Sequence, residues 1–121
     1  MIHEYYKEIQ NNQNIRENLS LLRSECKDPR ARETLLSLAG DGALLAGLLE
    51  SDEPKVRKNA ALLLGSLGLM QTAGSLFQAY EREQTLFVRS AYLTALSGME
   101  VSPYLEALKE HRDELLAREI P

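Results

Sequence analysis

The amino-acid sequence predicts an all-α fold, and within that class a right-handed α–α superhelix, or short α-solenoid, of about four antiparallel helix pairs. Two observations predict it. One arrangement of apolar side chains recurs in three stretches of the chain, and its spacing places those side chains on one face of a helix, without the alternation of a β-strand. Proline precedes two of these stretches and glycine follows each of them, which is typical of helix starts and ends.

The chain begins with two stretches that periodicity alone assigns to helices. Their apolar stripes are Ile2, Tyr5, Tyr6 and Ile9 in the first, and Ile15, Leu19, Leu22 and Cys26 in the second.

The recurring arrangement is clearest from Val56 onward. An arginine follows at once, and apolar residues come four, seven and eight positions after Val56. The same frame fits two more stretches. The three copies are Ala31, Arg32, Leu35, Leu38 and Ala39; Val56, Arg57, Ala60, Leu63 and Leu64; and Val88, Arg89, Tyr92, Ala95 and Leu96. We therefore expect these three helices to lie parallel and side by side, as consecutive rungs of the superhelix.

Residues at both ends of these helices have suitable chemistry. Asp28 is the expected N-cap before Pro29, and either Ser51 or Asp52 is the expected N-cap before Pro54. The glycines expected to end the helices in a left-handed cap are Gly40, Gly65 or Gly68, and Gly98.

Second helices are expected between the copies. Their apolar stripes lie within residues 44–49, 69–80 and 104–116, and the last of them opens at Ser102 and Pro103. The arginines of the three copies are 25 and 32 residues apart, being residues 32, 57 and 89. These intervals bracket the length of a two-helix unit, and the shorter one leaves room only for a brief helix near residues 41–50.

Residues 51–65 resemble the signature of HEAT repeats. The stretch reads Ser-Asp-Glu-Pro-Lys-Val-Arg-Lys-Asn-Ala-Ala-Leu-Leu-Leu-Gly, with the family's Asp-x-x-Pro-x-Val-Arg opening, a small pair and a closing Leu-Gly. Residues 27–32 are similar, and residues 86–89 keep the Val-Arg pair but have leucine in place of proline. The resemblance covers residues 28–118, and it implies a HEAT-like, armadillo-type superhelix.

The resemblance also implies a structural role for the acid and arginine positions, which commonly form a hydrogen-bonded ladder between repeats. Asp28 would pair with Arg32 and Asp52 with Arg57, while in the third copy Glu83 is the acid that could substitute. The expected structural positions are Asp28, Pro29, Arg32, Asp52, Pro54, Val56, Arg57, Val88 and Arg89.

Catalytic and cofactor chemistry are not expected in this chain. The two histidines, His3 and His111, lie near the N-terminus and in a charged segment, without a convincing nucleophile as partner. Residues 65–68, Gly-Ser-Leu-Gly, lack the spacing and the lysine of a phosphate-binding loop. The single cysteine, Cys26, is expected to pack as a reduced thiol. The sequence predicts no catalytic residue, no metal site and no cofactor.

The charge of the chain argues against a nucleic-acid binder that works by bulk electrostatics. The formal net charge is −4 over 121 residues. A local basic patch remains compatible with this balance, because eight of the 14 basic residues fall between positions 16 and 58: Arg16, Arg23, Lys27, Arg30, Arg32, Lys55, Arg57 and Lys58.

The function that the sequence favours is a non-catalytic HEAT-repeat module for protein interaction or scaffolding, with a protein or peptide as its partner. Residues 1–121 are expected to form one domain, cytoplasmic and without membrane contact. The alternative is an N-terminal accessory or substrate-recognition domain of a larger bacterial enzyme, for example an RNA methylase, because the chain ends directly after a predicted helix. By resemblance, a HEAT-like nucleic-acid glycosylase and a phycobilin lyase are weaker alternatives. The end helices of a short array also offer a surface for dimerisation.

Overall fold

The structure, a computed structural model, describes residues 1–99, and this part of the chain is helical without strands. It contains seven α-helices and two short 3₁₀ helices: α1 (Ile2–Gln10), α2 (Ile15–Glu25), α3 (Pro29–Ala39), α4 (Ala43–Gly47), η1 (Leu48–Glu50), α5 (Pro54–Leu67), η2 (Met70–Thr72), α6 (Ala73–Arg82) and α7 (Leu86–Gly98). The predicted all-α class is confirmed for these residues. The helix expected within residues 104–116 lies outside the described part.

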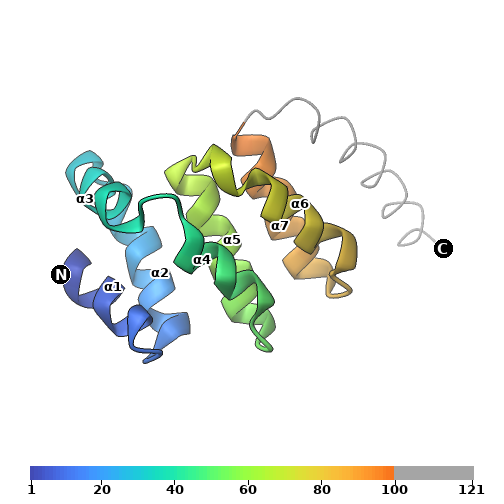
Figure 1. Cartoon of the computed structure of the whole chain (residues 1–121), viewed down its shortest axis with the longest axis horizontal. Coiled ribbons are helices and arrows are strands. Elements are labelled where there is room, and N and C mark those ends of the chain that lie inside the picture. Colours follow the sequence, from blue (N-terminus) through green and yellow to red (C-terminus); the bar gives the residue numbers. More distant parts are fainter. Residues whose placement is uncertain (100–121) are drawn as a thin grey trace.

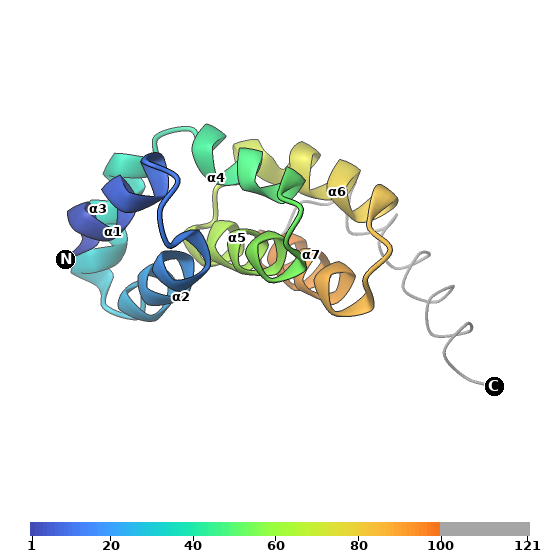
Figure 2. The ribbon, with the colours of Figure 1, turned by 90° about the horizontal axis from the view of Figure 1, so that it is seen from below.

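Helices α2, α5 and α7 lie side by side in one layer (Figures 1 and 2). They run parallel, because equivalent ends of neighbouring helices meet. At the C-terminal ends, the backbone of Gly65 in α5 approaches Ala95 in α7. Near the N-terminal ends, Arg57 of α5 contacts Glu83 in the segment that leads into α7. Three parallel helices therefore form one side of the molecule.

The second layer lies across from the first (Figure 2). Each of α1, α4 and α6 precedes a helix of the first layer and packs against it as an antiparallel pair: α1 with α2, α4 and η1 with α5, and α6 with α7. Helix α4 is short, as the brief helix expected near residues 41–50 requires, and η1 extends it to Glu50.

Helix α3 corrects the predicted order of the rungs. Residues 31–39 were expected beside residues 56–64, but α2 takes that place, and α3 packs mainly against α1 at the end of the molecule (Figure 1). Its stripe is correspondingly less buried: Ala31 and Leu38 are half-buried, whereas the equivalent Val56 and Leu63 are buried. Helix α3 also accounts for the short interval between Arg32 and Arg57. It is an additional helix between the α1–α2 and α4–α5 pairs, so this interval does not span a regular two-helix unit.

The hydrophobic core fills the space between the two layers, and the apolar stripes predicted from the sequence supply it. Its largest fully buried side chains are Tyr80, Tyr92, Leu19, Leu22, Leu35, Leu45, Leu63, Leu64, Leu76, Leu96 and Val88. Burying such side chains stabilises the fold by roughly 1.5–3 kcal/mol each.

The helix ends agree with the sequence in part. Asp28 caps α3 by accepting a hydrogen bond from the backbone N–H of Arg30, as predicted. The N-cap of α5 is Glu53 rather than Ser51 or Asp52, although the Ser51 hydroxyl accepts a hydrogen bond from the Glu53 N–H. Gly40 and Gly68, with φ of 58° and 63°, end α3 and α5. Gly98 is the last residue of α7, and the cap position is Met99.

Gly65 serves packing rather than capping. A Cβ atom at this position would lie 2.7 Å from Cα of Ala95, closer than real contacts allow. The missing side chain therefore lets α5 and α7 approach closely, and it holds the first layer together at its C-terminal side.

No helix within the described range is long and apolar enough to cross a membrane.

Candidate functional site

The best-defined polar contact in the structure joins Arg57 of α5 to Glu83, in the segment before α7. The guanidinium donates from Nε to Oε1 at 2.7 Å and from its NH2 group to Oε2 at 3.0 Å, so the pair is bidentate. The side chains are only 17% and 6% exposed. A pair so well shielded from water is costly to break, because the surviving partner would be left as a buried, unpaired charge.

Glu83 collects further donors. Its Oε2 accepts from the backbone N–H of Thr85 at 3.2 Å, and its Oε1 accepts from the hydroxyl of Tyr92 at 3.2 Å. Burial of Glu83 disfavours its charge, but the hydrogen bonds from Arg57, Thr85 and Tyr92 outweigh this cost and lower the pKa of the carboxyl. Burial and the adjacent carboxylate raise the pKa of Tyr92. Tyr92 is therefore a neutral donor, and Glu83 an ionised acceptor.

Two of the predicted arginines repeat one backbone contact. Arg57 donates to the carbonyl of Ser51 at 2.7 Å, and Arg89 donates to the carbonyl of Glu83 at 3.1 Å, in each case six residues back. Arg89 also lies 4.5 Å above the ring of Tyr80, a cation–π distance. The turns before α5 and α7 are thus fastened in the same way, and Ser51 and Glu83 are equivalent positions.

The expected acid–arginine pairs are not the ones that form. Asp52 is exposed in the turn before α5, and Arg57 binds Glu83 instead. Asp28 caps α3, whereas Arg32 reaches across to α5 and donates to the carbonyls of Ser66 and Leu67 at 3.1 and 2.9 Å. The physical reason for the second difference is the position of α3, which places Arg32 at the C-terminal end of α5.

The remaining predicted positions are structural. Pro29 and Pro54 are the first residues of α3 and α5, where their missing N–H costs nothing. Val56 and Val88 are buried.

The sequence analysis missed a further copy of the apolar-arginine pair that begins the repeated helices. Ile15 and Arg16 open α2 as Val56 and Arg57 open α5, and Leu19 and Leu22 then follow four and seven positions after Ile15. The pair Ile-Arg was the available signal. Asn14 is the N-cap of α2 and has a left-handed conformation, and this helix begins without a proline.

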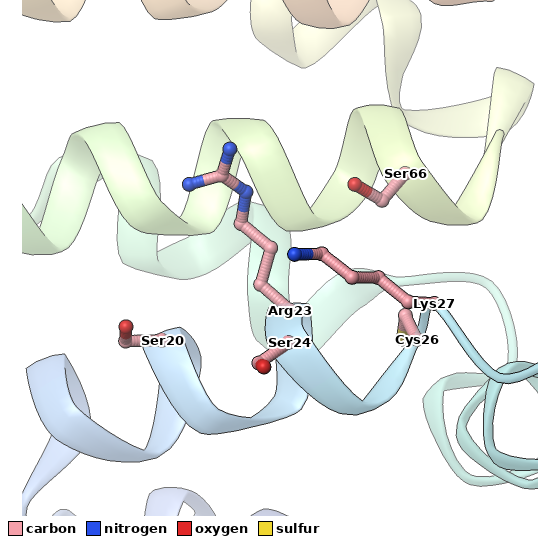
Figure 3. A pocket seen from close by; sticks show the side chains of 6 residues that line it. All are labelled: Ser20, Arg23, Ser24, Cys26, Lys27 and Ser66. Atoms are coloured by element: carbon pink, nitrogen blue, oxygen red, sulfur yellow. The ribbon is translucent and has the colours of Figure 1, made fainter.

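A basic pocket lies in the furrow between α2 and α5. Its volume is about 350 Å³, and its lining residues are Ser20, Arg23, Ser24, Cys26, Lys27 and Ser66. Figure 3 shows Arg23 extending from α2 toward α5 and Lys27 extending along the furrow toward Arg23, with Ser66 on the facing helix. Two of the basic residues that the sequence grouped together therefore meet at one site.

Three other members of that group lie at other sites. Arg57 is held by Glu83 and Arg32 by the end of α5. Arg16 borders a second cleft, of about 520 Å³, together with Asp52 and Glu53, where opposite charges offset one another. The cleft beside the Arg57–Glu83 pair, of about 690 Å³, is also mixed in charge. The α2–α5 pocket differs from both because cations and hydroxyl groups dominate its lining.

In the part of the chain that the structure describes, neither the thiol nor the imidazole considered from the sequence belongs to a cluster of metal-ligating side chains. Burial raises the pKa of the Cys26 thiol, although the nearby charge of Arg32 acts in the opposite sense. His3 is exposed on α1, and His111 lies outside the described residues. Within residues 1–99, no group of three or more histidine, cysteine or acidic side chains is placed to hold a metal ion.

Comparison with known proteins adds no family. No family model, no curated protein and no solved structure matches the chain significantly.

Proposed function

We propose that this chain is a short HEAT-like α-solenoid that serves as a protein-interaction or scaffold module. The observation that carries the proposal is the layer of three parallel helices, α2, α5 and α7, in which the turns before α5 and α7 are fastened by arginines at equivalent positions. Units that repeat one packing contact in this way stack in a row, and stacking creates an extended, rigid surface.

The outer face of the α2–α5–α7 layer is the surface we assign to the partner. It carries exposed or half-buried side chains from all three helices, among them Leu21, Lys58 and Ser90. A specific interface needs roughly 800 Å² on each partner, which would occupy much of this face. The Arg57–Glu83 pair and the close approach of Gly65 to Ala95 keep α5 and α7 in fixed positions, so little ordering entropy is lost on binding.

The test combines capture with direct binding. The tagged chain is used to capture partners from lysate of the cells that carry its gene, and each captured protein is purified and titrated against the chain by calorimetry. A triple variant, Leu21→Arg, Lys58→Glu and Ser90→Arg, changes one side chain on each helix of the layer. We expect it to weaken binding of the partner by tenfold or more.

A matched control lies in the second layer. Gln78 is exposed on α6, and Gln78→Arg should leave the affinity within about twofold of the unmodified chain. Equal affinity of all three proteins for the partner would place the interface elsewhere and contradict the assignment of the layer. Recovery of no protein partner, together with measured binding of RNA, would overturn the interaction module itself.

A further inference from the structure

The α2–α5 pocket has the composition of an oxyanion site. Arg23 and Lys27 supply two cations from one helix, and the hydroxyl groups of Ser20 and Ser24 supply neutral donors. The Ser66 hydroxyl, on the facing helix, donates to the carbonyl of Leu62. The guanidinium can bind two oxygens of one ligand at once, while the lysine contributes a point charge. These donors, all from α2 and its C-terminal turn, can bind several oxygens of one tetrahedral anion in the furrow.

Within residues 1–99, no ion pair balances the charges in this pocket. Arg23 and Lys27 are four residues apart on α2, where like charges repel by roughly 0.2–0.5 kcal/mol. Among the residues that the structure describes, neither side chain forms an ion pair, and no carboxylate lines the pocket. An anion in the furrow would relieve the repulsion.

Compensation of helix dipoles does not account for this arrangement. Basic side chains near a helix C-terminus are favourable, and Arg23 lies in the last turn of α2. That effect requires only closeness to the last carbonyls, and it leaves the side-chain tips free to point into water. Here Arg23 extends across the furrow toward α5, and Lys27 extends along the furrow with its ammonium group directed toward Arg23 (Figure 3).

Arg32 removes the main electrostatic obstacle on the facing side. The C-terminal carbonyls of α5 would present partial negative charge to an anion near Ser66. Arg32 donates to the carbonyls of Ser66 and Leu67, so these groups are satisfied and a third positive charge stands nearby. The charge of Arg32 acts on the thiol of Cys26, which lines the pocket, and the carboxylate of Glu25 acts on the same thiol in the opposite sense.

We propose that this pocket binds a phosphate monoester carried by a peptide partner, that is, a phosphorylated serine or threonine side chain. The partner class rests on the proposed interaction function. A monoester carries a charge of about −1.5 to −2 near neutral pH, which matches two cations, whereas each phosphodiester of a nucleic acid carries a single charge. The pocket, of about 350 Å³, admits a phosphoryl group with its attached side chain. The net charge of −4 disfavours a long polyanion.

The experiment titrates the ¹⁵N-labelled full chain with four probes and follows its amide NMR signals. The probes are the peptide Gly-Gly-phosphoserine-Gly-Gly, the same peptide without phosphate, inorganic phosphate, and a single-stranded RNA octamer. We expect saturable chemical-shift changes centred on residues 20–27 and 66. The affinity derived from them should be highest for the phosphopeptide and lower for inorganic phosphate, and the unmodified peptide should cause no such changes. If the same signals report a higher affinity for inorganic phosphate or for RNA than for the phosphopeptide, the assignment to a phosphorylated peptide is overturned.

Two double variants separate site from net charge. Arg23→Gln with Lys27→Gln should weaken phosphopeptide binding at least tenfold. Arg16→Gln with Lys55→Gln removes the same formal charge from exposed positions outside the pocket and should leave the affinity within twofold. Equal losses in the two variants, or no saturable binding to the unmodified chain, would overturn the pocket as an anion site. All four substituted positions are exposed, and an unchanged amide spectrum away from the pocket verifies the fold.

The outcome is independent of the test of the proposed function. A chain that binds its captured partner but no phosphopeptide refutes the phosphate site and leaves the interaction module standing. A chain that binds the phosphopeptide in this pocket, but recovers no protein partner and binds RNA at another surface, supports the phosphate site and refutes the module.

Discussion

Arg57 and Glu83 lie 26 positions apart in the sequence, yet two hydrogen bonds of 2.7 and 3.0 Å join them across α5 and the entrance of α7. The carboxylate also accepts from Thr85 and Tyr92, so the contact ties the start of α7 to the first turn of α5. One ion pair therefore sets the spacing of two neighbouring helices in the parallel layer.

The first prediction concerns the energy of this pair. Glu83→Ala should reduce the free energy of unfolding by about 3 kcal/mol, because it leaves the half-buried Arg57 without its charged partner. In a double-mutant cycle, Arg57→Ala and Glu83→Ala should be coupled by at least about 1 kcal/mol, measured by urea unfolding at neutral pH.

The chain offers a matched control for this cycle. Arg82 and Glu50 lie 3.7 Å apart, but their side chains are 55% and 75% exposed. Their coupling in the same cycle should stay below about 0.5 kcal/mol, because water screens the pair. Similar coupling energies for the two pairs would show that burial does not strengthen the Arg57–Glu83 interaction.

The second prediction is a pH dependence. The pKa of Glu83 is lower in the folded chain than its ordinary value of 4.5. Ionisation of Glu83 therefore stabilises the fold: its contribution is fully present above pH 4.5 and is lost as the pH falls through the folded pKa. In Glu83→Gln this contribution is missing at every pH.

Urea unfolding of both proteins from pH 7 to pH 3 measures the effect. The unmodified chain should be more stable than Glu83→Gln by about 2 kcal/mol at pH 7, and the difference should shrink below pH 4.5. A difference that stays constant down to pH 3 would show that Glu83 acts through packing rather than charge.

The third prediction separates two arginines of α3. Arg32 donates to two carbonyls at the end of α5, whereas the Arg30 side chain is exposed. Arg32→Ala should reduce the free energy of unfolding by about 1 kcal/mol, because those carbonyls lose a charged donor. Arg30→Ala should change it by less than about 0.5 kcal/mol. Thermal or urea unfolding distinguishes the two, and equal effects would contradict a tie between α3 and α5.

The sequence was sufficient to predict a helix and its buried face where helix start and stop signals flank an apolar stripe. Pro54, Val56 and Gly68 define α5 within the chain itself, so this helix and its buried face could be predicted. The apolar stripe of α3 is equally regular, but a stripe records only that one face is buried and not which helix covers it. The layer that α3 joins is decided by packing against α1, a long-range contact.

The polar partners were unpredictable for the same reason. Asp52 lies five residues before Arg57 and was the nearer acid, but the fold brings Glu83 closer. Arg32 finds carbonyl acceptors 34 and 35 residues away, which no local pattern encodes. The basic pocket combines Arg23 and Lys27, which share a visible i, i+4 spacing, with Ser66, which only the packing of α5 on α2 supplies.

The last prediction tests the close approach of α5 and α7. Gly65→Ala would improve the intrinsic helix propensity of α5 by roughly 1 kcal/mol, but the new methyl group would lie 2.7 Å from Cα of Ala95. Because that atom belongs to the backbone, relief requires the helices to move apart, at a cost of about 1–3 kcal/mol. We expect a net loss of stability.

Gly47→Ala is the matched control. Gly47 has helical dihedral angles, φ −60° and ψ −29°, and a Cβ atom there would meet nothing within 4 Å. This substitution should raise the free energy of unfolding by about 0.5–1 kcal/mol, because alanine loses less conformational entropy than glycine. Opposite signs for the two variants in urea unfolding would establish that Gly65 is required by its neighbour on α7, and a gain in both would contradict the close contact.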